Sequence, residues 1–185
     1  SIIQQAGTGT TTFGGALNTN DAAAIGIDLT GTNFTFNGAV TTTGVGTVEV
    51  TNSGTLTTAA AADMSLAGTF TQNGAGSNSL AGDITTTNDL ISFATAATLT
   101  GDLSMTAGSG GVTFSSTLEG TGAGTEDLSL SAAGGTITLS GALGATTRLG
   151  DLTFASAATV NTGAITASSI IQQAGTGTTT FGGAL

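Results

Sequence analysis

The chain has 185 residues, of which 41 are Thr and 31 are Gly, and its net charge is −10 with Arg148 as the only basic residue. It contains no Pro, Cys, Trp, Tyr, His or Lys. This composition excludes nucleic-acid binding by phosphate neutralisation, which needs Lys and Arg, a disulfide-stapled domain and the usual nucleophile and acid–base sets of enzymes. No run of residues approaches the ~20 apolar positions of a membrane span. We therefore expect no nucleic-acid partner, no membrane insertion and no catalytic, cofactor-binding or metal site.

Short strand-like elements follow one another along the whole chain. Thr and the branched aliphatic residues favour extended backbone, and Gly supplies the turns between them. In chain order the elements are expected at 11–13, 28–29, 34–36, 63–66, 83–84, 89–93, 102–105, 112–114, 127–130, 137–139 and 151–154. The run of four alanines at 59–62 is too short and uncapped to stand as a helix. Disorder is the alternative for such a biased composition, but a charged fraction of 6% and a mean hydropathy of +0.34 argue against it. We predict an all-β fold.

Seven of the eight Asp residues directly precede Leu, Ile or Met, and this pair marks the start of a degenerate repeat. From Asp63 to Asp151 the starts at 63, 83, 102, 127 and 151 are 20, 19, 25 and 24 residues apart. The gap of 35 residues after Asp28 and the gap of 45 residues beyond Asp151 are interpreted as about two units each. Within each strand apolar and polar residues alternate, so one side faces inward and the other outward.

A longer repeat contains the short one. Residues 1–17 (SIIQQAGTGTTTFGGAL) recur without a change as residues 169–185, which sets a period of 168 residues. We interpret residues 1–168 as one full tandem repeat, about eight units of about 21 residues, and residues 169–185 as the start of the next. The chain is then a window on a longer array, in which the following repeat covers the open strand edge by recreating the surface that Ser1 begins.

Two architectures fit strands of this kind. An antiparallel sandwich would use hairpins, for which Asn37-Gly38 and Asn73-Gly74 offer turn signals. A parallel β-helix (β-solenoid) fits better, because the unit varies in length and no linker or proline marks the junction at 168. Phe as the only aromatic residue suits a dry, narrow core. We expect a right-handed coil whose eight turns, at ~4.8 Å each, make one period ~38 Å long.

The pattern D-L-S-L-x-A-x-G-G-x-I-T-L-x-G-A-L, seen from Asp127 to Leu143, resembles the strand repeats of filamentous-haemagglutinin-like exoproteins and related giant bacterial surface proteins. The resemblance covers most of the chain. It implies an exported, rod-like stalk or adhesin held at a bacterial cell surface. The adhesive Arg-Gly-Asp motif is not present, since Arg148 is followed by Leu149, Gly150 and Asp151. The near-total loss of basic residues favours the stalk over host-cell adhesion.

Candidate binding features are few. Calcium is the best metal candidate because it takes oxygen ligands, and Glu126-Asp127 beside Gly120, Gly122 and Gly124 offers a loose surface site. We prefer to interpret both residues as solvated corner residues. The nonapeptide of calcium-binding β-rolls is missing its aspartate at 108–111 (GSGG). The Asp residues that start the units could stack around a cation, or each could cap a turn by accepting a nearby N–H, which we prefer.

Threonine triplets at 10–12, 41–43 and 85–87 suggest the Thr-rich faces of ice-binding β-helices. Their spacings of 31 and 44 residues do not place them at every turn, so outward Thr ladders that keep the rod wettable are the simpler interpretation.

The expected function is therefore that of a structural segment in an extracellular fibre, stalk or sheath that is long, stiff and protease-resistant. Its partners would be neighbouring repeats or copies of itself, stacked end to end or associated laterally. The alternative is a cell-surface adhesin module that binds glycans or another surface through a repeated lateral face, and ice binding is a remote third.

Overall fold

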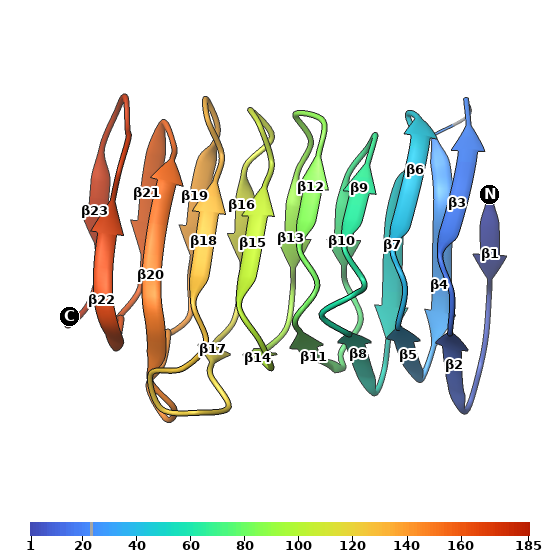
Figure 1. Cartoon of the computed structure of the whole chain (residues 1–185), viewed down its shortest axis with the longest axis horizontal. Coiled ribbons are helices and arrows are strands. Elements are labelled where there is room, and N and C mark those ends of the chain that lie inside the picture. The colour runs from blue at the N-terminus through green and yellow to red at the C-terminus, as the bar shows by residue number, and fades with distance from the viewer. Residues whose placement is uncertain (23) are drawn as a thin grey trace.

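The protein is a parallel β-solenoid of about eight turns, with equivalent positions about 22 residues apart (Figure 1). The structure is a computed structural model that describes residues 1–22 and 24–185, with the backbone alone at Asp21. Every regular element in the described part of the chain is a strand. The predicted all-β class, the β-solenoid architecture and the number of turns are confirmed.

Each turn of the solenoid crosses three parallel sheets, which we call A, B and C in the order in which the chain meets them. Sheet A contains β1 (Ile2–Gln4), β4 (Ile25–Gly31), β7 (Thr47–Asn52), β10 (Phe70–Gln72), β13 (Ile91–Phe93), β16 (Val112–Phe114), β19 (Thr136–Leu139), β21 (Thr159–Thr162) and β23 (Thr179–Phe181). Sheet B contains β2 (Thr10–Phe13), β5 (Asn33–Phe36), β8 (Thr55–Thr58), β11 (Ser77–Leu80), β14 (Ala97–Leu99) and β17 (Leu118–Glu119). Sheet C contains β3 (Leu17–Asp21), β6 (Val40–Gly44), β9 (Met64–Leu66), β12 (Ile84–Thr86), β15 (Leu103–Thr106), β18 (Leu128–Ser131), β20 (Leu149–Ser156) and β22 (Ala167–Gln172).

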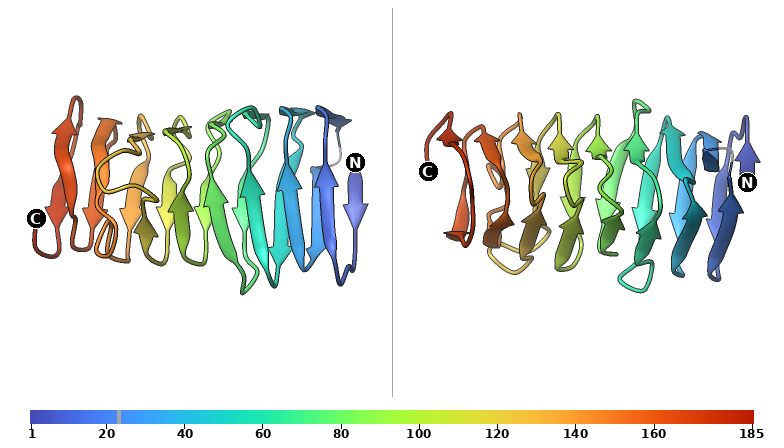
Figure 2. Two further views of the ribbon diagram at one scale, coloured as in Figure 1. Left: turned by 60° about the horizontal axis from the view of Figure 1, so that its bottom comes forward. Right: turned by 90° about the horizontal axis from the view of Figure 1, so that it is seen from above.

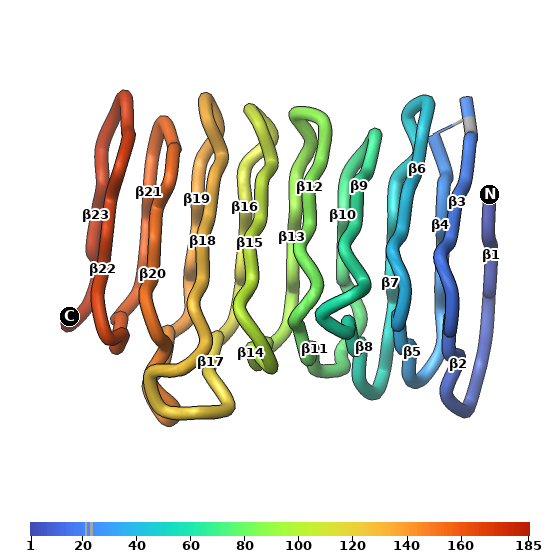
Figure 3. Tube along the Cα trace, viewed as in Figure 1, coloured from blue at the N-terminus to red at the C-terminus, as the bar shows by residue number. Residues whose placement is uncertain are grey.

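Sheet B narrows to single bridges in the later turns. Leu118 pairs with Leu143 and Leu143 pairs with Ile165, so the three-sided coil continues without a break. The chain advances in one direction along the rod, and the two termini lie at opposite ends (Figures 2 and 3).

The turn signals mark corners and not hairpins. Asn37-Gly38 lies between β5 and β6, and Asn73-Gly74 lies between β10 and β11. Among the described strands every pairing is parallel. The alanines at 59–62 form a turn, in which Ala62 N–H donates to the Ala59 carbonyl at 2.8 Å.

One continuous hydrophobic core runs through the stack from Ile27 to Ile165. It follows from the period-two pattern, because alternate residues of each strand point inward and meet the same position of the next turn. Phe93, which is fully buried, has its ring centroid 5.1 Å from that of Phe70 and 5.0 Å from that of Phe114. The Phe93 ring is tilted by 38° against Phe70 and stacks at 7° on Phe114, and these contacts join three successive turns of sheet A.

Polar side chains also enter the interior at one corner. Gln72 is fully buried at the end of β10, and its amide donates to Asn52 Oδ1 at 2.8 Å and to the Gly74 carbonyl at 3.1 Å. Its Oε1 accepts from Thr95 Oγ1 at 3.2 Å. These bonds satisfy buried polar groups where the chain leaves sheet A, so that the corner is fixed by hydrogen bonds between neighbouring turns.

The unit starts fall on two different sheets. Asp63 immediately precedes β9 on sheet C, whereas Asp28 lies within β4 on sheet A. The 35-residue step between them is therefore one and two-thirds turns, and not the two turns that the spacing indicated.

Candidate functional site: an acidic ladder along sheet C

Five exposed aspartates form a row where the chain enters successive strands of sheet C. We call this row the acidic ladder; its members are Asp63, Asp83, Asp102, Asp127 and Asp151. Neighbouring members are one turn apart, and the steps from Asp63 to Asp83, from Asp102 to Asp127 and from Asp127 to Asp151 are in register, at ~4.8 Å along the rod. Between Asp83 and Asp102 the row is displaced by two residues along the strand, because Ile84 pairs with Met105 and not with Leu103. The row exists because five of the seven predicted unit starts enter sheet C at the same corner. The other two, at Asp28 and Asp89, lie in or just before strands of sheet A.

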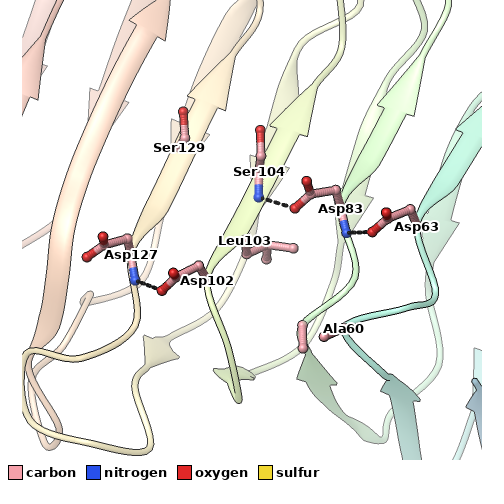
Figure 4. A pocket seen from close by; sticks show the side chains of 9 residues that line it. Ala60, Asp63, Asp83, Asp102, Leu103, Ser104, Asp127 and Ser129 are labelled. Carbon is pink, nitrogen blue, oxygen red and sulfur yellow. Dashed lines mark hydrogen bonds between the residues drawn. The ribbon is translucent and has the colours of Figure 1, made fainter.

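One oxygen of each carboxylate in the ladder binds the next turn, and Figure 4 shows the bonds that Asp63, Asp83 and Asp102 accept. The Oδ1 atoms of Asp63, Asp83, Asp102 and Asp127 accept backbone N–H groups from Asp83 at 3.0 Å, Ser104 at 2.8 Å, Asp127 at 3.0 Å and Asp151 at 2.7 Å, respectively. At the last step Ser169 Oγ donates to Asp151 Oδ1 at 2.7 Å. Each of these four aspartates therefore accepts a backbone N–H, as the capping interpretation requires. The donor, however, lies in the following turn of the solenoid and not in the aspartate's own corner. These charge-assisted bonds offset the repulsion between stacked carboxylates.

An open groove of about 570 Å³ follows the ladder (Figure 4). Its walls are Ala60, Asp63, Ala81, Asp83, Asp102, Leu103, Ser104, Asp127 and Ser129. The lining combines exposed carboxylates with small hydroxyl and methyl groups. Such a surface attracts cations and repels anionic surfaces.

Glu126 and Asp127, the residues considered for calcium, do not converge. Asp127 belongs to the ladder, whereas Glu126 is buried beneath its own loop. Glu126 Oε1 accepts from Thr121 Oγ1 at 2.7 Å and from Gly122 N–H at 3.0 Å, and Oε2 accepts from Thr121 N–H at 3.1 Å. Burial by itself raises the pKa of Glu126, but the hydrogen bonds from Thr121, Thr125 and Gly122 outweigh it and lower the pKa from 4.5 to about 2. The ionised carboxylate of Glu126 thus holds the loop at 120–126 in place through the hydrogen bonds that it accepts.

The described residues contain no group of three or more His, Cys, Asp or Glu placed to hold a metal ion. The GSGG segment at 108–111 forms the corner before β16, where Gly108 and Gly111 have φ of 52° and 92°. A side chain at Gly108 would also collide with Asn88 Oδ1, so this position requires glycine for both conformation and space.

The threonine triplets lie on two sheets. Residues 10–12 belong to β2 on sheet B, whereas 41–43 lie in β6 and 85–87 begin within β12, both on sheet C. β9 lies between these last two strands and carries Met64-Ser65-Leu66. The middle residues Thr42 and Thr86 are buried, with only 4% of their surface exposed. The triplets therefore do not line one flat face.

Arg148 is exposed and its guanidinium lies beside Gly124. In the part of the chain that the structure describes, no helix is long and apolar enough to cross a membrane. The chain matches no known protein-family model, and neither curated proteins nor solved structures give a significant match.

The inward polar residues that hold the corner between sheets A and B were not identified from the sequence. Asn52 follows two inward apolar residues, at Val48-x-Val50-x-Asn52, and Gln72 follows one, at Phe70-x-Gln72. That alternation is the signal that could have identified them as buried corner residues.

Proposed function

We propose that this chain is a structural segment of an extracellular fibre, stalk or sheath. The observation that supports the proposal best is the uninterrupted core, which joins every turn from Ile27 to Ile165 in one cluster. A rod of this kind transmits its stiffness from turn to turn, since each turn contacts only its neighbours and all are joined by strand pairing. The resemblance to filamentous-haemagglutinin-like repeats rests on the repeat pattern and supports an exported, surface-held parent.

The outward surface also supports a spacer. On sheet A one outward position is occupied on successive turns by small polar residues, namely Thr71, Ser92, Thr113, Thr138 and Asn161. Interchangeable Ser, Thr and Asn keep the rod hydrated without building a specific recognition surface. With one Arg and no Lys, the chain also gives trypsin-like proteases a single cleavage point.

Solution scattering and electron microscopy of chains with one, two and four tandem copies would test the proposal. A continuous rod made of turns ~4.8 Å apart should lengthen by about 37 Å per copy at constant cross-section. A chain of separate beads, or an increment far from this value, would contradict it.

The alternative is an adhesin module, and the groove along the acidic ladder is the observation that favours it. A glycan array probed with the 185-residue chain tests this alternative. Specific binding that is lost in Asp83→Asn but kept in Glu49→Gln, an exposed carboxylate on sheet A, would support the adhesin over the spacer.

A further inference from the structure

The two identical segments of the chain lie on different sides of the solenoid. Residues 2–4 form β1 on sheet A and pair with β4, whereas the identical residues 170–172 lie in β22 on sheet C and pair with β20. Likewise, residues 10–13 form β2 on sheet B, whereas the counterparts of residues 11–13, at 179–181, form β23 on sheet A. The repeat at Ser169 therefore does not recreate the surface of Ser1 in place, but one side further round.

The local structure of the segment is nevertheless the same in both places. Thr11 Oγ1 donates to Gln4 Oε1 at 2.9 Å, and the equivalent bond from Thr179 Oγ1 to Gln172 Oε1 is 2.7 Å. The inward residues also correspond, since residue 2 stacks on buried Ile27 and residue 170 stacks on buried Leu152. The local sequence of the segment therefore determines the conformation of its corner. The same corner joins sheet A to sheet B near the N-terminus and sheet C to sheet A near the C-terminus.

The number of turns in one period explains the displacement. Seven turns separate β1 from β21 on sheet A, and the chain then crosses two further corners to reach β22 on sheet C. One period of 168 residues is therefore seven and two-thirds turns.

From this fraction we infer that, in a tandem array, each copy is rotated by one-third of a turn relative to the copy before it. The inference rests on the array of the proposed function. Suppose that the three sides of the rod are named after the sheets of the first copy. Sheet C of the second copy then lies on side B, and sheet C of the third copy lies on side A. The original orientation returns after three copies, or 23 turns, because three times seven and two-thirds is a whole number.

The rotation decides what kind of partner the lateral surface fits. The acidic ladder of successive copies faces three directions in turn, so no side of the fibre carries it continuously. A flat surface that needs one face repeated along its length could contact one copy in three. The arrangement fits a partner that approaches a single copy from any direction, and it opposes the packing of parallel fibres into sheets through one acidic face.

The placement of the second segment can be tested in the 185-residue chain, which has no Cys of its own. Thr153 and Ile171 are outward partners on β20 and β22, and paired residues of adjacent strands are close enough for a disulfide. We expect the double variant Thr153→Cys with Ile171→Cys to lose both thiols on mild oxidation without forming a disulfide-linked dimer. The matched pair Asn161→Cys with Ile171→Cys, which would meet only if the segment lay on sheet A over β21, should keep its thiols. Cross-linking of the second pair, or of neither, would overturn the inference.

The rotation itself can be measured in a chain of two copies, residues 1–168 followed by 1–185. One spin label is placed at Ser65 of the second copy, on sheet C, and the other at Glu49, Thr57 or Ser65 of the first copy, on sheets A, B and C of the same turn. Pulsed electron paramagnetic resonance should give the shortest distance for the pair that starts at Thr57, close to the axial advance of eight turns, about 38 Å. A shortest distance for the pair of identical positions would refute the rotation but leave the fibre intact. If the scattering length fails to grow by one period, the array itself is refuted.

Discussion

Removal of the Phe93 ring should destabilise the solenoid more than any other single Phe truncation. Phe93 is fully buried, and its ring centroid lies 5.1 Å from that of Phe70 in a tilted contact and 5.0 Å from that of Phe114 in a stacked one. A buried Phe→Ala substitution costs about 3–5 kcal/mol, and each aromatic contact adds about 0.5–1.5 kcal/mol. We expect Phe93→Ala to lower the free energy of unfolding by about 4–5 kcal/mol, at the upper end of the range, because two ring contacts are lost together.

The measurement is urea unfolding of the 185-residue chain followed by far-ultraviolet circular dichroism. Phe154 is the matched control, since it is equally buried but takes part in none of the ring stacks found among the described residues. Phe154→Ala should cost about 3–4 kcal/mol. Phe181 is 39% exposed, so Phe181→Ala should cost about 1 kcal/mol.

Two outcomes would refute this reasoning. Equal losses for Phe93→Ala and Phe154→Ala would show that ring stacking between turns contributes nothing beyond burial. A loss below about 1 kcal/mol for Phe93→Ala would show that the turns do not stack through this core at all.

Three further predictions concern the loop, the corner and the ladder. Because the pKa of Glu126 is lowered to about 2 in the folded chain, its contribution is complete above the ordinary value of 4.5 and is lost as the pH falls toward 2. Glu126→Gln should therefore cost about 1–2 kcal/mol at pH 7 and little at pH 2 in parallel urea titrations; a pH-independent loss would contradict the role of its charge. A methyl group at Gly76 would collide with the Gly54 carbonyl, so Gly76→Ala should lower the thermal midpoint at a cost of about 1–3 kcal/mol, whereas Gly9→Ala, with nothing within 4 Å, should not. Asp102→Ala removes the acceptor for one backbone N–H and should cost about 1 kcal/mol, but Asp102→Asn keeps an acceptor and relieves repulsion, so unfolding curves should place it at or above the native stability.

The sequence by itself determined the elements and their sidedness. Alternation in stretches such as Val112-Thr113-Phe114 places two apolar residues on one side of a strand, and recurrence of the Asp-Leu start at Asp102 and Asp127 specifies one turn. These are local properties, since period two follows from the pleat of any strand. Alternation alone also fits an antiparallel sandwich, and the variable length of the unit and the junction without linker or proline favour the parallel solenoid.

Tertiary structure alone decided how many sides a turn has and where each corner lies. The sequence pattern treats Asp28 and Asp63 as equivalent starts, although they lie on sheets A and C. A corner depends on contacts with the neighbouring turn, such as the buried hydrogen bond between Gln72 and Asn52. These two residues are 20 positions apart, and the local sequence around either one does not indicate that they meet. For the same reason the identity of residues 1–17 and 169–185 indicated an exact repeat of surface, whereas the accumulated corners leave the second segment one-third of a turn away.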